Sequence, residues 1–100
     1  MSSAEETLQL IGDGKTFEEI ARIRGRQLAT VVNMVADLIE KGRLEYRTEW
    51  VTALHRERIE EAVKRLGSQW LKPLREAVPE EITSDRIRLV VALVGSKESR

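Results

Sequence analysis

Gly25 separates two apolar stripes, and this break constrains the fold more than any other feature of the chain. The first stripe occupies residues 17–23 and follows Thr16, which is spaced from Glu19 as in a helical capping box. The second stripe occupies residues 28–39 at three- and four-residue intervals. Because glycine enters the left-handed backbone region at little cost, it commonly ends a helix. The pattern therefore predicts a short capped helix, a tight turn and a helix of roughly fourteen residues.

A short helix, a turn with glycine and a longer helix make up a helix-turn-helix motif. Ala21, four residues before Gly25, is small where the two helices would cross, and Val31, six residues after it, would face the crossing. Arg24 and Arg26 flank the glycine at positions where many such motifs carry an apolar residue. An ordinary pair of packed helices is therefore the alternative to a DNA-reading motif.

The segments around this motif are also mainly helical in pattern. Ser3 and Glu6 have capping-box spacing and predict a first helix over residues 4–11. After Gly42, apolar and charged residues alternate up to Arg47, which favours a short extended segment. This segment suits a winged-helix wing, and a charged surface connector is the alternative.

The second half of the chain predicts a helical lobe. Thr52 can cap a helix over residues 53–66, and a short helix is expected to begin near Lys72 or Pro73. The last apolar segment, residues 85–94, suits a helix, with a buried strand as the alternative because β-branched residues are frequent there. We therefore predict a mainly α fold in one small domain, residues 1–100. Its parts are a helix-turn-helix with a possible short wing (3–47), a helical lobe (52–94) and a frayed tail (95–100).

The composition excludes several classes of function. The 17 basic and 17 acidic residues cancel, so binding to a polyanion would depend on local clusters of charge. No cysteine is present, and one histidine, His55, cannot form a metal site by itself. Neighbouring carboxylates on a helix point about 100 degrees apart, so they do not form a catalytic pair by spacing alone. No membrane span or signal peptide is expected, and we predict a cytoplasmic, nucleoid-associated, non-catalytic chain without a cofactor.

The candidate partner is DNA, bound by basic and amide side chains around the turn. Arginine suits phosphates, and Gln and Asn can pair with adenine edges. Glu18 and Glu19 lie one turn before Arg22 and could pair with it instead. The alternative is a docking or weakly dimerising module that uses the outward face of the second motif helix, including Met34. The predicted DNA-binding residues are Arg22, Arg24, Arg26, Gln27, Thr30, Asn33, Arg43 and Arg47.

Three aromatic side chains, Tyr46, Trp50 and Trp70, have apolar neighbours at core-like spacing. This spacing favours burial, and a tryptophan from the second half could hold the two parts together. Stacking on unpaired bases is the alternative role for these rings.

Two stretches of the chain resemble the C-terminal helix-turn-helix domain of bacterial RecQ-type ATP-dependent DNA helicases. The first is LQLIGDGKTFEEIARIRGRQLATVVNMVADLIEKGRL, and the second is IEEAVKRLGSQWLKPLREAVPEEITSDRIRLVVALV. Both halves occur in the family's order, from Thr7 to about Val94. The resemblance implies an accessory DNA-binding domain joined to the rest of a helicase chain, in DNA repair and recombination. The chain itself has no phosphate-binding loop of the Gly-x-x-x-x-Gly-Lys-(Ser/Thr) type.

Overall fold

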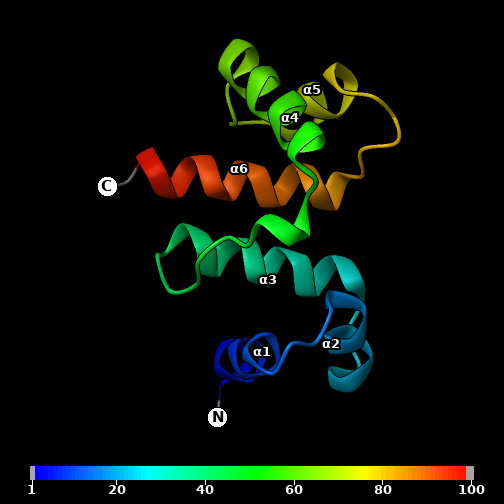
Figure 1. The fold of residues 1–100 in the computed structure, drawn as a ribbon, viewed down its shortest axis with the longest axis vertical. Helices are drawn as coiled ribbons and strands as arrows, with labels where there is room; N and C mark the ends of the chain where they lie inside the picture. The colour runs from blue at the N-terminus through cyan, green and yellow to red at the C-terminus, as the bar shows by residue number, and fades with distance from the viewer. Residues whose placement is uncertain (1, 99–100) are drawn as a thin grey trace.

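The computed structural model describes residues 2–98, which form six α-helices and one short 3-10 helix, with no strand among them. The helices are stacked along the longest dimension of the molecule, 40 Å (Figure 1). At one end lie α1 and α2, followed by α3, then α6, and finally α4 and α5 at the other end. The mainly α prediction is confirmed. The elements are α1 (Ser3–Gly12), α2 (Phe17–Arg24), α3 (Leu28–Glu40), η1 (Thr48–Trp50), α4 (Ala53–Leu66), α5 (Leu71–Ala77) and α6 (Ser84–Glu98).

The start of α2 is fixed by the predicted capping box. The Glu19 amide donates to Thr16 Oγ1 at 3.1 Å, and the Thr16 amide donates to Glu19 Oε1 at 2.9 Å. Each side chain thus satisfies a backbone donor that would otherwise lack a partner at the helix start. The predicted cap of α4 is also present: the Thr52 hydroxyl accepts a hydrogen bond from the His55 amide at 3.3 Å.

The turn between α2 and α3 is a glycine-ended helix terminus. Gly25 has a φ of 63°, in the left-handed region. The Arg26 amide donates to the Ala21 carbonyl at 2.9 Å, and the Gly25 amide donates to the Arg22 carbonyl at 3.3 Å. These two bonds form a Schellman motif, which redirects the chain from α2 into α3 within three residues. The sequence prediction of the helix-turn-helix is confirmed.

A single apolar core runs through the whole stack. Its buried members come from every α-helix and include Ile11, Ile20, Val35, Ile59 and Val90. The helix-turn-helix and the helical lobe therefore form one packed body. No helix in residues 2–98 is both long enough and apolar enough to cross a membrane.

The last helix, α6, lies between α3 and the pair α4 and α5 (Figure 1). It runs parallel to α3, since Leu89 lies near Leu28 at one end and Gly95 lies near Glu40 at the other. A helix covered on two sides is apolar over much of its surface, which explains its strand-like composition. The predicted helix is confirmed, and the strand alternative is wrong. The predicted fraying of residues 95–100 is wrong for 95–98, which continue the helix, whereas 99–100 lie outside the described residues.

The connection after α3 corrects the wing prediction. Residues 43–47 form no strand, and the chain enters η1 directly after them. A wing needs a hairpin, and no second strand exists in residues 2–98 to pair with this segment. The segment instead places the Tyr46 ring against the Trp50 ring, with centroids 6.0 Å apart. The centroids of the Trp50 and Phe17 rings are 5.1 Å apart.

The other corrections concern single residues. Trp50 and Tyr46 are partly buried against the core, as predicted. Trp70 is 69% exposed, so the prediction of its burial is wrong. The first helix is capped by Ser2, whose hydroxyl accepts from the Glu5 amide at 3.2 Å, so the cap lies one residue earlier than expected.

Candidate nucleic-acid interface

One face of α3 is open to solvent, and the predicted polar residues lie on it. Thr30 and Asn33 are exposed one turn apart, and Gln27 is exposed at the N-cap. The opposite side of the helix is buried against α2 and α6, with Val31 and Val35 at most 1% exposed. The amphipathic pattern of the sequence therefore places these three polar side chains together on the free face.

The N-terminal half of this face carries no negative charge. The first turn of α3 contains no acidic residue, and no side chain caps it. The partial positive charge of a helix start, with its unpaired amides, favours an anion. Farther along, Asp37 pairs with Lys41 at 2.8 Å, so the second half of the face has both signs of charge. The N-terminal half of this face thus favours an anion, whereas the C-terminal half does not.

Arg22 lies in the last turn of α2, and Arg26 lies in the turn that leads into α3. Both are exposed, and neither forms an ion pair with another described residue. The alternative partner Glu19 is held mainly by Thr16, whose amide and hydroxyl lower the pKa of the Glu19 carboxyl, with smaller effects from Lys15 and Arg22. These two guanidinium groups are therefore available to a ligand.

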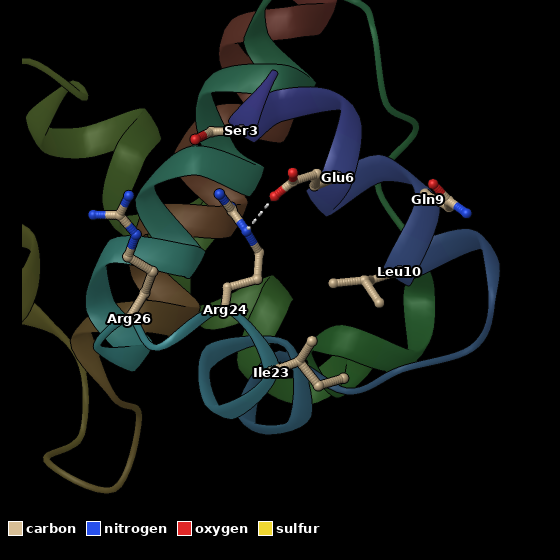
Figure 2. A pocket seen from close by; sticks show the side chains of 7 residues that line it. All are labelled: Ser3, Glu6, Gln9, Leu10, Ile23, Arg24 and Arg26. Carbon is tan, nitrogen blue, oxygen red and sulfur yellow. Dashed lines mark ion pairs between the residues drawn. The ribbon is translucent and has the colours of Figure 1, made fainter. Parts of the chain in front are cut away.

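Arg24 differs from Arg22 and Arg26 in its surroundings. Its side chain is only 8% exposed, and its Nε lies 3.4 Å from Glu6 Oε2 of α1 (Figure 2). The same guanidinium donates to Thr7 Oγ1 at 2.7 Å and contacts Met34 Sδ at 3.7 Å. Arg24, predicted as a DNA-binding residue, is therefore nearly buried and has an acidic partner. This side chain joins α1, α2 and α3.

Met34 also belongs to this contact. It is half-buried, and its sulfur accepts a hydrogen bond from Thr7 at 3.2 Å. The hypothesis that Met34 forms part of an outward docking face is not supported by this position. Sequence spacing gave no signal for the contact, since Thr7 and Met34 are 27 residues apart.

Arg43 and Arg47 are separated from the turn. Both come after the C-terminal end of α3, and a helix of 13 residues is about 20 Å long. Arg43 is exposed, but Arg47 is half-buried and donates to the Ile11 carbonyl at 3.4 Å. The Arg47 guanidinium also lies 5.9 Å from the centre of the Trp50 ring. The structure therefore leaves Arg43 as an isolated surface charge and uses Arg47 in packing.

A groove of about 630 Å³ opens beside the turn, between α1 and α2. Leu10 and Ile23 form its apolar wall, and the Arg24–Glu6 pair lies at its side, while Arg26 points away from that pair (Figure 2). Ile23 is 55% exposed, although it belongs to the apolar stripe of α2. An exposed apolar wall of this kind suits a protein contact better than a phosphate contact.

The residues that could support catalysis or metal binding are dispersed. His55 lies in the first turn of α4 and is half-buried. Residues 2–98 contain no group of three or more His, Asp or Glu side chains that could hold a metal ion. The arrangement of described residues around the turn is one for binding, with cations and amides beside a free helix face.

The geometry agrees with a comparison against known protein families. The model of a family described as a helix-turn-helix domain matches residues 3–91, which is most of the chain. The chain belongs to this helix-turn-helix family. Helix-turn-helix domains commonly bind DNA, so at this coarse level DNA is the partner that the family indicates. Searches of curated proteins and of solved structures gave no match.

Proposed function

We propose that this helix-turn-helix domain binds duplex DNA mainly through the phosphate backbone, as an accessory domain of a RecQ-like helicase. The observation that carries the proposal is the open, acid-free start of α3, preceded in the chain by Arg22 and Arg26, which form no ion pair with a described residue. In this proposal the chain contributes binding only, and the ATP-dependent motor lies elsewhere in the parent protein. The helicase link is supported by the resemblance of both halves of the sequence to RecQ C-terminal domains.

The charge distribution along α3 suggests how the helix would approach DNA. The major groove is about 12 Å wide and accepts one helix. Gln27, Thr30 and Asn33 would face base edges or the groove wall, and the two free arginines would contact phosphates. Asp37 and Glu40 would be repelled by the backbone, so the N-terminal end of the helix enters first.

Weak sequence preference follows from the same residues. Gln and Asn can each pair with adenine, but only two such side chains lie on the free face. Most of the affinity would then come from phosphate contacts, which carry no sequence information. Such binding suits a protein that moves along DNA.

The direct test is a fluorescence-anisotropy titration of duplex and forked DNA at two salt concentrations. The variant is Arg22→Glu with Arg26→Glu, and its matched control is Arg58→Glu with Lys97→Glu, which changes the same charge at exposed sites on α4 and α6. We expect the first variant to lose at least about tenfold in affinity and to reduce the log–log salt slope by about 1.8. Equal affinity of both variants, with unchanged circular dichroism, would exclude this surface as the binding site.

The second candidate is protein docking or weak self-association through the groove between α1 and α2. The observation that favours it is the exposed apolar side chain of Ile23 beside Leu10. Ile23→Ser should then abolish a concentration-dependent increase in mass by light scattering and leave DNA affinity unchanged. A constant monomer mass for the unmodified protein at all concentrations would rule out self-association.

A further inference from the structure

Trp70 is the most exposed large apolar side chain that the structure describes, at 69%. It lies at the N-cap of α5, just after the connection from α4. Unlike Trp50, its ring contacts no other aromatic ring and no cation within residues 2–98. Tryptophan is usually well buried because its ring has a large apolar area, so an exposed ring without a partner indicates a binding role.

Basic side chains lie on both sides of Trp70 in the sequence. The tract from Lys64 to Arg75 contains four basic residues and no acidic one. Lys64 and Arg65 lie in the last turn of α4, and Lys72 lies in the first turn of α5; all three are exposed. None of the three forms an ion pair with a described residue. Their charges are therefore available to an anion.

Three other charged residues, Arg75, Glu61 and Glu76, lie near these cations in the sequence. Arg75, the fourth basic residue, donates to the Pro79 carbonyl at 3.0 Å and to the Ile82 carbonyl, so it supports the connection to α6. Glu61 and Glu76 flank the tract and are exposed, and neither pairs with its lysines or arginines. Leu66 and Leu71, which lie within four residues of Trp70 in the sequence, are also exposed apolar side chains, at 49% and 42%.

We propose that this surface binds single-stranded nucleic acid, with Trp70 stacking on an unpaired base and Lys64, Arg65 and Lys72 holding phosphates. The ligand must offer a flat apolar group and several negative charges at once, and a nucleic-acid strand with free bases does so. In a duplex the faces of the bases are covered by the neighbouring base pairs. A duplex could therefore bring phosphates to the cations but no base face to the Trp70 ring. We name this surface, Lys64, Arg65, Trp70 and Lys72, the strand site.

The strand site is distinct from the helix-turn-helix surface. In Figure 1, α4 and α5 lie at the opposite end of the long axis from α1 and α2. The molecule extends 40 Å along this axis, so a strand and a duplex could be held at the two ends together. The inference therefore goes beyond duplex binding and does not depend on it.

The test uses a labelled oligothymidylate of about 16 nucleotides, within the range of single-strand binding sites, and an abasic strand of the same length. In a Trp50→Phe protein, the remaining tryptophan fluorescence reports Trp70 alone, and we expect oligothymidylate to quench it. Trp70→Ser should weaken oligothymidylate binding by about tenfold. Lys64→Glu with Lys72→Glu should weaken the binding of both strands.

Matched controls distinguish this site from the duplex site. Leu54→Ser removes another exposed apolar side chain, of 61% exposure, and Lys15→Glu alters an exposed charge near α2; both should leave strand binding unchanged. Arg22→Glu with Arg26→Glu should spare strand binding whether or not it reduces duplex binding, so failure of the duplex site and failure of the strand site are distinguishable. Equal affinity for the abasic strand and oligothymidylate, absence of quenching, or stronger quenching by an acidic polyglutamate peptide would each overturn the proposal.

Discussion

The turn between α2 and α3 and the connection between α4 and α5 both carry several basic side chains, but the fold uses them differently. At the turn, Arg24 is 8% exposed and joins three helices, while Arg22 and Arg26 remain free. At the connection, the exposed basic residues have no ion-pair partner within residues 2–98, and Trp70, which lies between them in the sequence, is also exposed. The comparison shows that packing decides which basic side chains keep their charge exposed to solvent.

The largest expected effect tests whether the two regions share one folding unit. Leu89 is 2% exposed on α6 and lies near Leu28 and Val32 of α3. Leu89→Ala should lower the free energy of unfolding by about 2–5 kcal/mol through the lost burial and the cavity left behind. Urea unfolding followed by tryptophan fluorescence and by circular dichroism should give coincident transitions.

Leu54→Ala is the matched control, because Leu54 is 61% exposed and its truncation should change stability by no more than about 0.5 kcal/mol. Two separate transitions in the Leu89→Ala protein would show that the helix-turn-helix and the lobe unfold independently. That result would contradict the single continuous core.

The next effect separates the structural arginine from a free one. Arg24→Ala should reduce the free energy of unfolding by about 1–3 kcal/mol, because it removes a nearly buried guanidinium, its ion pair with the half-exposed Glu6 and the donor to the buried Thr7 hydroxyl. Arg26→Ala should change stability by no more than about 0.5 kcal/mol but weaken duplex binding. Thermal unfolding and DNA titrations of both variants test this contrast, and a greater loss of DNA affinity for Arg24→Ala would reverse it.

A smaller effect concerns Tyr46, beside Trp50. Burial raises the pKa of the Tyr46 hydroxyl above its ordinary value of 10.0. A raised pKa in the folded state means that this group's contribution to stability is present below pH 10 and is lost as the pH rises through the folded pKa. The hydroxyl is buried and has no hydrogen-bond partner in the described part of the chain, so Tyr46→Phe should cost little at neutral pH.

Urea unfolding midpoints at neutral pH and above pH 10 measure the stability that the protein loses when the Tyr46 hydroxyl ionises. We expect Tyr46→Phe to lose less stability than the unmodified protein in the alkaline range. An equal alkaline loss in both proteins would assign it to another group.

The smallest effect is at the α2 cap. Hydrogen bonds from Thr16 lower the pKa of Glu19 below its ordinary value of 4.5. The associated stability is therefore present above that pH and is lost as the pH falls through the lower folded pKa. Glu19→Gln keeps an acceptor for the Thr16 amide but cannot titrate, so its thermal midpoint should fall less steeply on acidification. Glu18→Gln, at an exposed residue with no capping bond, should leave the steepness unchanged.

The sequence predicted the features that depend on neighbouring residues. The capping box of Thr16 and Glu19, the turn at Gly25 and the cap at Thr52 each involve groups within five residues. Such bonds form from local spacing whatever lies around them, so residue types alone predict them well.

The errors concern contacts between distant parts of the chain. Arg24 meets Glu6 on another helix, and no local rule joins residues 18 positions apart. The burial of Trp70 depends on whether another helix covers it, and the periodicity of the sequence does not predict that. The Lys64–Arg75 tract without a carboxylate was nevertheless visible in the sequence, and it is the signal that marks the strand site.

The position of α6 also has a consequence for the order of assembly. The helix α3 carries the proposed groove-reading residues on its free face. Its apolar side is covered by α6, the last helix in residues 2–98. Contacts between segments so far apart in sequence form late and slow the folding of a chain. During synthesis from the N-terminus, the helix-turn-helix would therefore emerge with one side uncovered until α6 leaves the ribosome. Competence to bind a duplex should appear abruptly, once translation has passed the end of α6.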